Sequence, residues 1–193
     1  MNSLKEKRRI QIIKASMKVF GEHGFYKGTV EDIAIQAGLG KGTIYEYFSS
    51  KKEIFQQMLS YMFETYSEVA IESTLKEDTI RNKFIALLDY HWDFVTEHAN
   101  VIEQTFFRFE NISQEIRPHV IKVQKRIFEF IFNMVTEGVK RGEISPTINK
   151  ELVSLIVLST INGSNSKRII FKEKDCIDSK AVIDTIFNGI GNQ

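Results

Sequence analysis

Cysteine and proline are scarce in this sequence of 193 residues, which contains one Cys and two Pro. A single cysteine excludes an intramolecular disulfide, and Cys176 therefore fits a reducing cytoplasm. Few prolines and 42% hydrophobic residues are typical of a mostly helical protein. The uncharged run at residues 153–166 is too short and too polar to span a bilayer, so we expect no membrane partner.

Patterns that carry catalysis or bind metal are also missing. The four histidines have no acid or cysteine nearby at metal-ligand spacing. The glycines within residues 38–42 lack the spacing, and the preceding strand, of a phosphate-binding loop. We therefore expect no enzymatic activity, no catalytic residue, no cofactor and no metal.

Charge is unevenly distributed along the chain, although the net charge is only +1. Residues 1–52 carry a net charge of +5, which leaves −4 for the remainder. A basic end on an acidic body suits phosphate binding at that end. The basic cluster Lys5, Lys7, Arg8 and Arg9 could be a flexible arm that reaches DNA, or a solvated first helical turn.

The segment at residues 28–55 reads GTVEDIAIQAGLGKGTIYEYFSSKKEIF. Thr29 is a good N-cap for a short helix, and Asp32 follows it at capping-box spacing. Gly38 suits the left-handed position that ends this helix. A second short helix follows at residues 40–48, and a third begins near Lys51. This is the arrangement of a helix-turn-helix DNA reader.

The second of these helices carries groups that suit contact with DNA. Lys41 supplies a positive charge for phosphate, and the hydroxyls of Thr43, Tyr45 and Tyr47 can bond to phosphate oxygens. Gly42 would let the backbone approach the duplex closely. The alternative is a small surface helix with two half-buried tyrosines, since many three-helix domains share this pattern.

Together with residues 12–16 and 20–25, this motif resembles the TetR family of bacterial transcriptional regulators over roughly residues 8–60. The resemblance implies an all-α fold of about nine helices. A helix-turn-helix DNA-binding domain would occupy residues 1–50, and a helical effector-binding and dimerisation domain residues 51–193. The DNA contacts that it implies are Thr29, Lys41, Gly42, Thr43, Tyr45, Tyr47 and Lys51.

Glu46 departs from the family pattern at an outward position of the second short helix. Its carboxylate could accept a hydrogen bond from a cytosine amino group. Alternatively, phosphate repels it or a neighbouring cation pairs with it.

Beyond the motif, the sequence predicts helices throughout. The first helix is expected over residues 4–22, and Pro118 suits the first turn of a seventh helix. Asn149 can cap the eighth helix, which would extend to about residue 171, and Asp178 or Ser179 can cap the ninth. In the family these two helices form a four-helix dimer interface, and the corresponding residues are Leu152, Ile156, Ser159, Gly163, Ile183, Ile186 and Phe187. The alternative is that this face packs only inside the protomer; we favour the homodimer, because one reader makes few contacts with DNA.

The second domain is rich in aromatic side chains, which are usually core. A mostly apolar pocket between helices, with a few polar groups, is nevertheless a common ligand site. The resemblance implies an effector, which would be apolar or amphipathic, and the candidate contacts are Phe84, Leu88, His91, Trp92, Phe106, Arg108, Phe128 and Asn162.

The expected protein is thus a cytoplasmic repressor that binds a palindromic operator in double-stranded DNA as a homodimer. A small apolar or amphipathic effector would release it. The alternative is a DNA-binding protein with no small-molecule effector, controlled by a protein partner or organising DNA.

Overall fold

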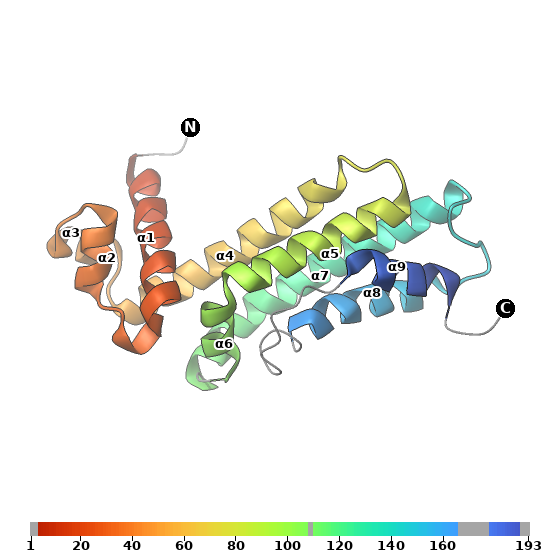
Figure 1. The fold of residues 1–193 in the computed structure, drawn as a ribbon. Helices are drawn as coiled ribbons and strands as arrows, with labels where there is room; N and C mark the ends of the chain where they lie inside the picture. The colour runs from red at the N-terminus through yellow and green to blue at the C-terminus, as the bar shows by residue number, and fades with distance from the viewer. Residues whose placement is uncertain (1–3, 108–109, 166–177, 190–193) are drawn as a thin grey trace. The chain divides into compact units, whose positions relative to one another are not determined.

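The computed structural model describes residues 4–107, 110–165 and 178–189, with the backbone alone for residues 104–107, 110–116 and 164–165. All regular structure in these ranges is helical, which confirms the predicted all-α fold (Figure 1). The nine helices of the described chain are α1 (Leu4–Lys27), α2 (Val30–Ala37), α3 (Lys41–Tyr47), α4 (Lys51–Thr74), α5 (Ile80–Glu97), α6 (Ala99–Phe107), α7 (Glu110–Lys140), α8 (Lys150–Asn165) and α9 (Ser179–Asn188).

The first helix breaks at Gly24, whose φ of 75° favours glycine, close to the predicted end at residue 22, and α1 continues beyond this kink as a second helical piece. The predicted start of the seventh helix is wrong. Helix α7 begins at Glu110, so Pro118 lies inside it rather than in its first turn. A proline removes one backbone hydrogen bond, and α7 continues through that loss. The predicted end of the eighth helix near residue 171, and Cys176, lie outside the described residues.

The chain divides into two compact units. Unit 1 comprises Met1–Glu64 and His98–Val120, and unit 2 comprises Thr65–Glu97 and Ile121–Gln193. Helices α4 and α7 therefore each contribute to both units. The division of function at residue 50, with a DNA-binding domain at 1–50 and an effector-binding domain at 51–193, remains a prediction.

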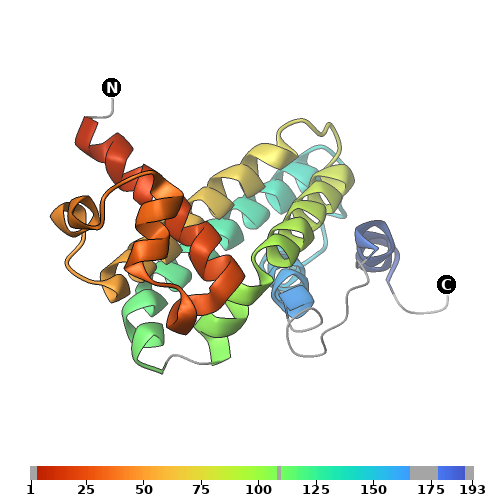
Figure 2. The ribbon, with the colours of Figure 1, turned by 60° about the vertical axis from the view of Figure 1, so that its left-hand side comes forward.

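In unit 1, α1 packs against α2 and α6, and α2 packs against α3 (Figures 1 and 2). The apolar faces expected from helical spacing meet there, and Ile12, Ile33 and Ile44 are fully buried. Phe20 and Phe55 lie edge to face with ring centroids 5.3 Å apart, a favoured aromatic geometry. This core fixes the short α2 and α3 against the longer α1.

In unit 2, α5 is the central helix and packs against α8 and α9. Phe84 and Leu87 of α5 are fully buried. The buried Tyr66 hydroxyl and the His91 Nδ1 lie 2.8 Å apart, which joins α4 to α5 by a hydrogen bond. Burial raises the pKa of Tyr66, so the hydroxyl stays protonated within this core.

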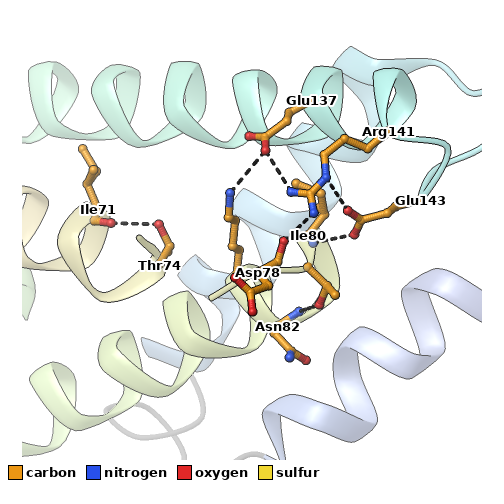
Figure 3. A network of polar contacts seen from close by, with 10 residues as sticks. Ile71, Thr74, Asp78, Ile80, Asn82, Glu137, Arg141 and Glu143 are labelled. Carbon is orange, nitrogen blue, oxygen red and sulfur yellow. Dashed lines mark hydrogen bonds and ion pairs between the residues drawn. The ribbon is translucent and has the colours of Figure 1, made fainter. Parts of the chain in front are cut away.

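A polar network fixes the turn between α4 and α5 to the end of α7 (Figure 3). Arg141 Nη2 donates to the Asp78 carbonyl at 2.6 Å, and Arg141 Nη1 donates to Glu137 at 3.0 Å. The hydrogen bond from Arg141 lowers the pKa of the Glu137 carboxyl. Gly138 follows Glu137 in α7, and an added Cβ there would be 2.7 Å from Ile144 Cδ1 and 3.1 Å from Ile80 Cγ1, so these side chains would have to shift.

Candidate nucleic-acid interface

Helix α2 begins with the capping box that the sequence predicts. Thr29 Oγ1 accepts a hydrogen bond from the Asp32 N–H at 3.1 Å. Asp32 Oδ2 accepts in return from the Thr29 N–H at 2.9 Å and from the Thr29 hydroxyl at 2.7 Å. These bonds, that of the hydroxyl first, lower the pKa of Asp32. The hydroxyl proton of Thr29 is thus used by Asp32, so a phosphate at this position would have to compete for it.

The turn between α2 and α3 is also as expected. Gly38 has a φ of 65° and a ψ of 36°, the left-handed conformation that ends a helix. The N–H of Gly38 donates to the Ile35 carbonyl and that of Leu39 to the Ala34 carbonyl. Two of the carbonyls that the end of α2 exposes are thereby satisfied.

Two side chains of α1 form hydrogen bonds to the ends of α2 and α3. Neither of these contacts was predicted from the sequence. Gln11 Nε2 donates to the Ala37 carbonyl at the end of α2, at 2.7 Å. Arg9 Nη1 donates to the Tyr47 carbonyl at 3.3 Å, and the Arg9 guanidinium lies 4.7 Å from the Phe48 ring centroid. Only the fold brings these distant residues together, so the sequence alone carried no signal for either bond.

The basic cluster at residues 5–9 is helical, since α1 begins at Leu4. The structure therefore favours a helical turn over an extended arm, with Lys5 and Lys7 exposed and Arg8 and Arg9 half-buried. Arg9 stabilises the end of α3, and Arg8 donates to Gln11 at 3.0 Å.

The predicted contact residues of α3 lie at or near its surface. Lys41, Gly42 and Tyr45 are exposed, Tyr45 by 49%, while Thr43 and Tyr47 are half-buried. An added Cβ at Gly42 would meet no atom of the chain within 4 Å, so packing does not require glycine there. The buried Ile44 anchors the helix from the opposite side. Exposed Glu46 lies on the same short helix.

Two predicted phosphate-binding lysines already have partners. Lys41 Nζ lies 3.3 Å from Glu31 Oε2, and both side chains are more than half exposed. Lys51 Nζ donates to the Tyr26 carbonyl at 3.2 Å and lies 4.7 Å from the Phe25 ring centroid. Partial burial lowers the pKa of Lys51. A phosphate would have to replace Glu31 at Lys41 and the Tyr26 carbonyl at Lys51.

The start of α4 is fixed beside Lys51 by a second reciprocal cap. Ser50 Oγ accepts from the Glu53 N–H at 3.1 Å, and Glu53 Oε2 accepts from the Ser49 hydroxyl and N–H, each at 2.7 Å. These bonds, that of the hydroxyl first, lower the pKa of Glu53. The Lys51 backbone is thereby held in place, which leaves only its side chain to adapt to a phosphate.

The residues predicted to contact the effector differ in how deeply they are buried. Phe84, Leu88, Trp92 and His91 are buried on α5, and Phe128 is half-buried on α7. Asn162 is exposed on α8. The side chain of Phe106, and Arg108 as a whole, lie outside the described residues. The structure thus places four of the eight candidates together in the core of unit 2.

The residues predicted to form the dimer interface also differ in how far they are exposed. Leu152 is 55% and Ile156 42% exposed, and Ser159 and Gly163 are exposed on the same helix, α8. On α9, Ile186 and Phe187 are half-buried, whereas Ile183 has no exposed surface. Ile183 therefore packs inside unit 2 and offers nothing to a partner in this arrangement.

Within the described residues, no group of three or more His, Cys, Asp or Glu side chains is placed to hold a metal ion. None of the helices in the described part of the chain is long and apolar enough to cross a membrane.

Comparison with known proteins agrees with this arrangement. Residues 12–58 match the family model "Bacterial regulatory proteins, tetR family", and residues 77–166 match "Tetracyclin repressor-like, C-terminal domain". The chain is 26% identical to the fatty acid metabolism regulator protein of Bacillus subtilis, over 98% of this chain and 100% of the relative.

Two solved structures share the fold. The transcriptional regulator FadR of Bacillus subtilis, crystallised in complex with stearoyl-CoA, superposes with a TM-score of 0.73 at 24% identity, over 94% of this chain and 99% of that one. The TetR family regulator PfmR of Thermus thermophilus gives a TM-score of 0.68 at 22% identity, over 94% and 99% of the two chains.

The chain belongs to the TetR family of transcriptional regulators. This family is non-enzymatic and pairs an N-terminal helix-turn-helix with a C-terminal helical ligand-binding domain, as the sequence predicted.

Proposed function

We propose that this chain is a cytoplasmic repressor that binds a palindromic operator as a homodimer and leaves it when a long-chain acyl-CoA binds. The observation that carries the proposal is the similarity over the whole length of both chains to a regulator of fatty acid metabolism. A homologue of the same fold binds stearoyl-CoA. An acyl-CoA also satisfies the expectation of an amphipathic effector, because its chain is apolar and its nucleotide is charged.

The reader would place α3 in the major groove. Tyr45 and Thr43 would touch base edges, while Lys41, Lys51, Tyr47 and the start of α2 at Thr29 would contact phosphates. The close backbone approach at Gly42 is open for this purpose. Two readers related by a two-fold axis would recognise half-sites about 34–36 Å apart, or a multiple of that spacing.

The dimer would form through α8, with support from α9. Leu152 and Ile156 are large apolar side chains exposed on one helix, which is unusual for a surface in contact with water alone. Ser159 and Gly163 continue this face with small residues, so two copies of α8 could approach closely.

The effector would act on the buried aromatic part of unit 2, where α5 carries Phe84, Leu88, His91 and Trp92. Because α4 contributes to both units, a shift of α4 would reach the reader through the continuous helix. The effector can shift this equilibrium only by the difference between its affinities for the two conformations.

The test is a gel-shift titration on the DNA upstream of the protein's own gene, with and without palmitoyl-CoA. We expect a specific complex that weakens with salt, that Tyr45→Ala and Lys51→Ala weaken, and that palmitoyl-CoA dissociates. A complex that forms specifically but ignores every acyl-CoA would favour the regulator without a small-molecule effector. The absence of any specific complex would overturn the proposal.

A further inference from the structure

About three turns of α7 carry a concentration of positive charge that DNA binding does not explain. Residues 117–128 include four Lys or Arg and no Asp or Glu, although residues 53–193 together carry a net charge of −4. Three of these basic residues, Lys122, Lys125 and Arg126, belong to unit 2, and all three are exposed. Positions three and four apart on a helix are neighbours, so the three side chains form one cationic surface.

The contacts of this surface leave it open to an anion. Arg126 Nη1 donates to Ser67 Oγ of α4 at 3.1 Å, which orients the guanidinium without neutralising it. Lys125 Nζ lies 3.8 Å from Glu129 Oε1, and both side chains are more than 60% exposed. An exposed pair at that distance contributes little, so a phosphate can replace Glu129 as the partner of Lys125.

The same side of α7 becomes aromatic further along. Ile121, Lys125, Phe128 and Phe132 follow one another at spacings of four, three and four, which places them on one stripe of the helix. Phe128 and Phe132 are half-buried, with ring centroids 6.4 Å apart. At 1.5 Å per residue, Lys125 and Phe132 are separated by roughly 10 Å along the axis. Lys125 therefore lies on the same stripe as the two phenylalanines, next to Phe128.

The cationic surface also lies beside the aromatic core of unit 2. Ser67, which Arg126 contacts, directly follows Tyr66 in α4. Tyr66 bonds to His91 and packs against Tyr90 and Phe94 of α5, with ring centroids 5.7 Å and 4.7 Å away. Arg126 and the aromatic cluster thus contact consecutive residues of α4, Ser67 and Tyr66.

We propose that Lys122, Lys125 and Arg126 bind the phosphate groups of the coenzyme A part of an acyl-CoA effector. This site rests on the proposed function, and it adds the residues that would distinguish an acyl-CoA from other apolar compounds. The nucleotide of coenzyme A carries a pyrophosphate and a ribose phosphate, which can engage several cations at once. Arg126 can bind a phosphate through two N–H groups, and the lysines act as point charges. The acyl chain would then extend toward Phe128 and Phe132.

The test compares palmitoyl-CoA with palmitoyl-pantetheine, which has the same acyl thioester but no nucleotide, both below their micellar concentrations. Binding is measured by calorimetry on the full-length protein and on the triple variant Lys122→Gln, Lys125→Gln, Arg126→Gln. The matched control is Lys76→Gln, Lys140→Gln, Lys180→Gln, which removes the same charge from other exposed positions of unit 2.

We expect the triple variant to bind palmitoyl-CoA at least about tenfold more weakly, and palmitoyl-pantetheine within about twofold of the wild type. The control variant should bind both as the wild type does, and salt should weaken only palmitoyl-CoA binding. If the triple variant bound palmitoyl-CoA as the wild type does, or lost affinity equally for both ligands, the phosphate-binding site would be overturned and the proposed function would stand. A loss of operator affinity in the effector-free triple variant would assign the surface to DNA instead. A wild type that binds neither ligand would overturn the proposed function itself.

Discussion

The Glu143 carboxylate accepts a hydrogen bond from the Ile80 N–H at 2.7 Å, although 63 residues separate the two in the chain. Ile80 begins α5, and the first N–H groups of a helix have no partner within it. Glu143 therefore caps α5 from a different segment, and Arg141 Nε holds the cap in place at 2.8 Å (Figure 3). The loop after α7 and the start of α5 are thereby joined within unit 2.

Replacing Glu143 with alanine should destabilise the protein, because Ile80 N–H and Arg141 would both lose an acceptor. We expect the free energy of unfolding to fall by about 2 kcal/mol, and the melting temperature by about 5 °C. Circular dichroism during heating measures both. Glu129→Ala is the matched control, since Glu129 is exposed and only weakly paired; an equal loss in the two variants would contradict the cap.

The capping box at α2 should make stability depend on pH in a defined direction. The pKa of Asp32 is below its ordinary value of 3.8 because Thr29 donates to its charged form. A depressed carboxyl pKa contributes stability that is present above the unfolded value and lost as the pH falls through the folded value. Wild type should therefore be more stable than Asp32→Asn at pH 7, and the difference should shrink below about pH 4.

Urea unfolding of the two proteins at several pH values between 7 and 3 measures this difference. Because Glu53 titrates in both proteins, taking the difference removes its contribution. If the difference in free energy of unfolding between wild type and Asp32→Asn stayed constant from pH 7 to pH 3, the Asp32 charge would have no part in the cap.

The elements that could be predicted from the sequence depend on near neighbours. The Thr29 and Asp32 capping box, the Gly38 turn and the buried face with Ile33 and Ile44 all follow from spacings of a few residues. The N-cap of α9 by Asp178, which accepts from the Ala181 N–H at 3.0 Å, is equally local and was one of the two caps predicted, the other being Ser179.

The features that could not be predicted join distant segments. Arg9 had the appearance of one more basic residue for DNA, yet its partner is the Tyr47 carbonyl, 38 residues away. Glu143 lies in the loop after α7, and only the fold places its carboxylate at the start of α5. Ile183 matched the apolar pattern of a dimer face, but that pattern cannot distinguish burial inside the protomer from burial between two copies. Helical periodicity identifies an apolar face and leaves its partner open.

The Glu31–Lys41 pair should reduce affinity for DNA, because the carboxylate competes with phosphate for the lysine. Glu31→Gln should bind the operator about two- to fivefold more tightly at low salt, with a smaller gain at high salt. Fluorescence anisotropy with labelled operator measures the dissociation constants.

A double-mutant cycle with Lys41→Gln tests whether Glu31 acts through the lysine. If it does, Glu31→Gln should give little gain in the Lys41→Gln background. Lys41→Gln alone should also lower the slope of log affinity against log salt by about one. An equal gain from Glu31→Gln in both backgrounds would mean that Glu31 only repels DNA and does not hold Lys41.

The exposed apolar face of α8 should decide the oligomeric state. Charged side chains at Leu152 and Ile156 disrupt an interface between two copies, since unpaired charges resist burial, but should spare the fold because both positions are exposed. Leu152→Glu with Ile156→Glu, whose like charges cannot pair with each other, should therefore sediment as a 22.4 kDa monomer, while the wild type sediments at about twice that mass. The operator affinity of the variant should fall by at least about a hundredfold, because the two readers would no longer bind as one molecule. Leu75→Glu alters an equally large side chain that is 70% exposed at the end of α4 and should leave both properties unchanged. A variant that remains dimeric and binds the operator normally would move the interface away from α8.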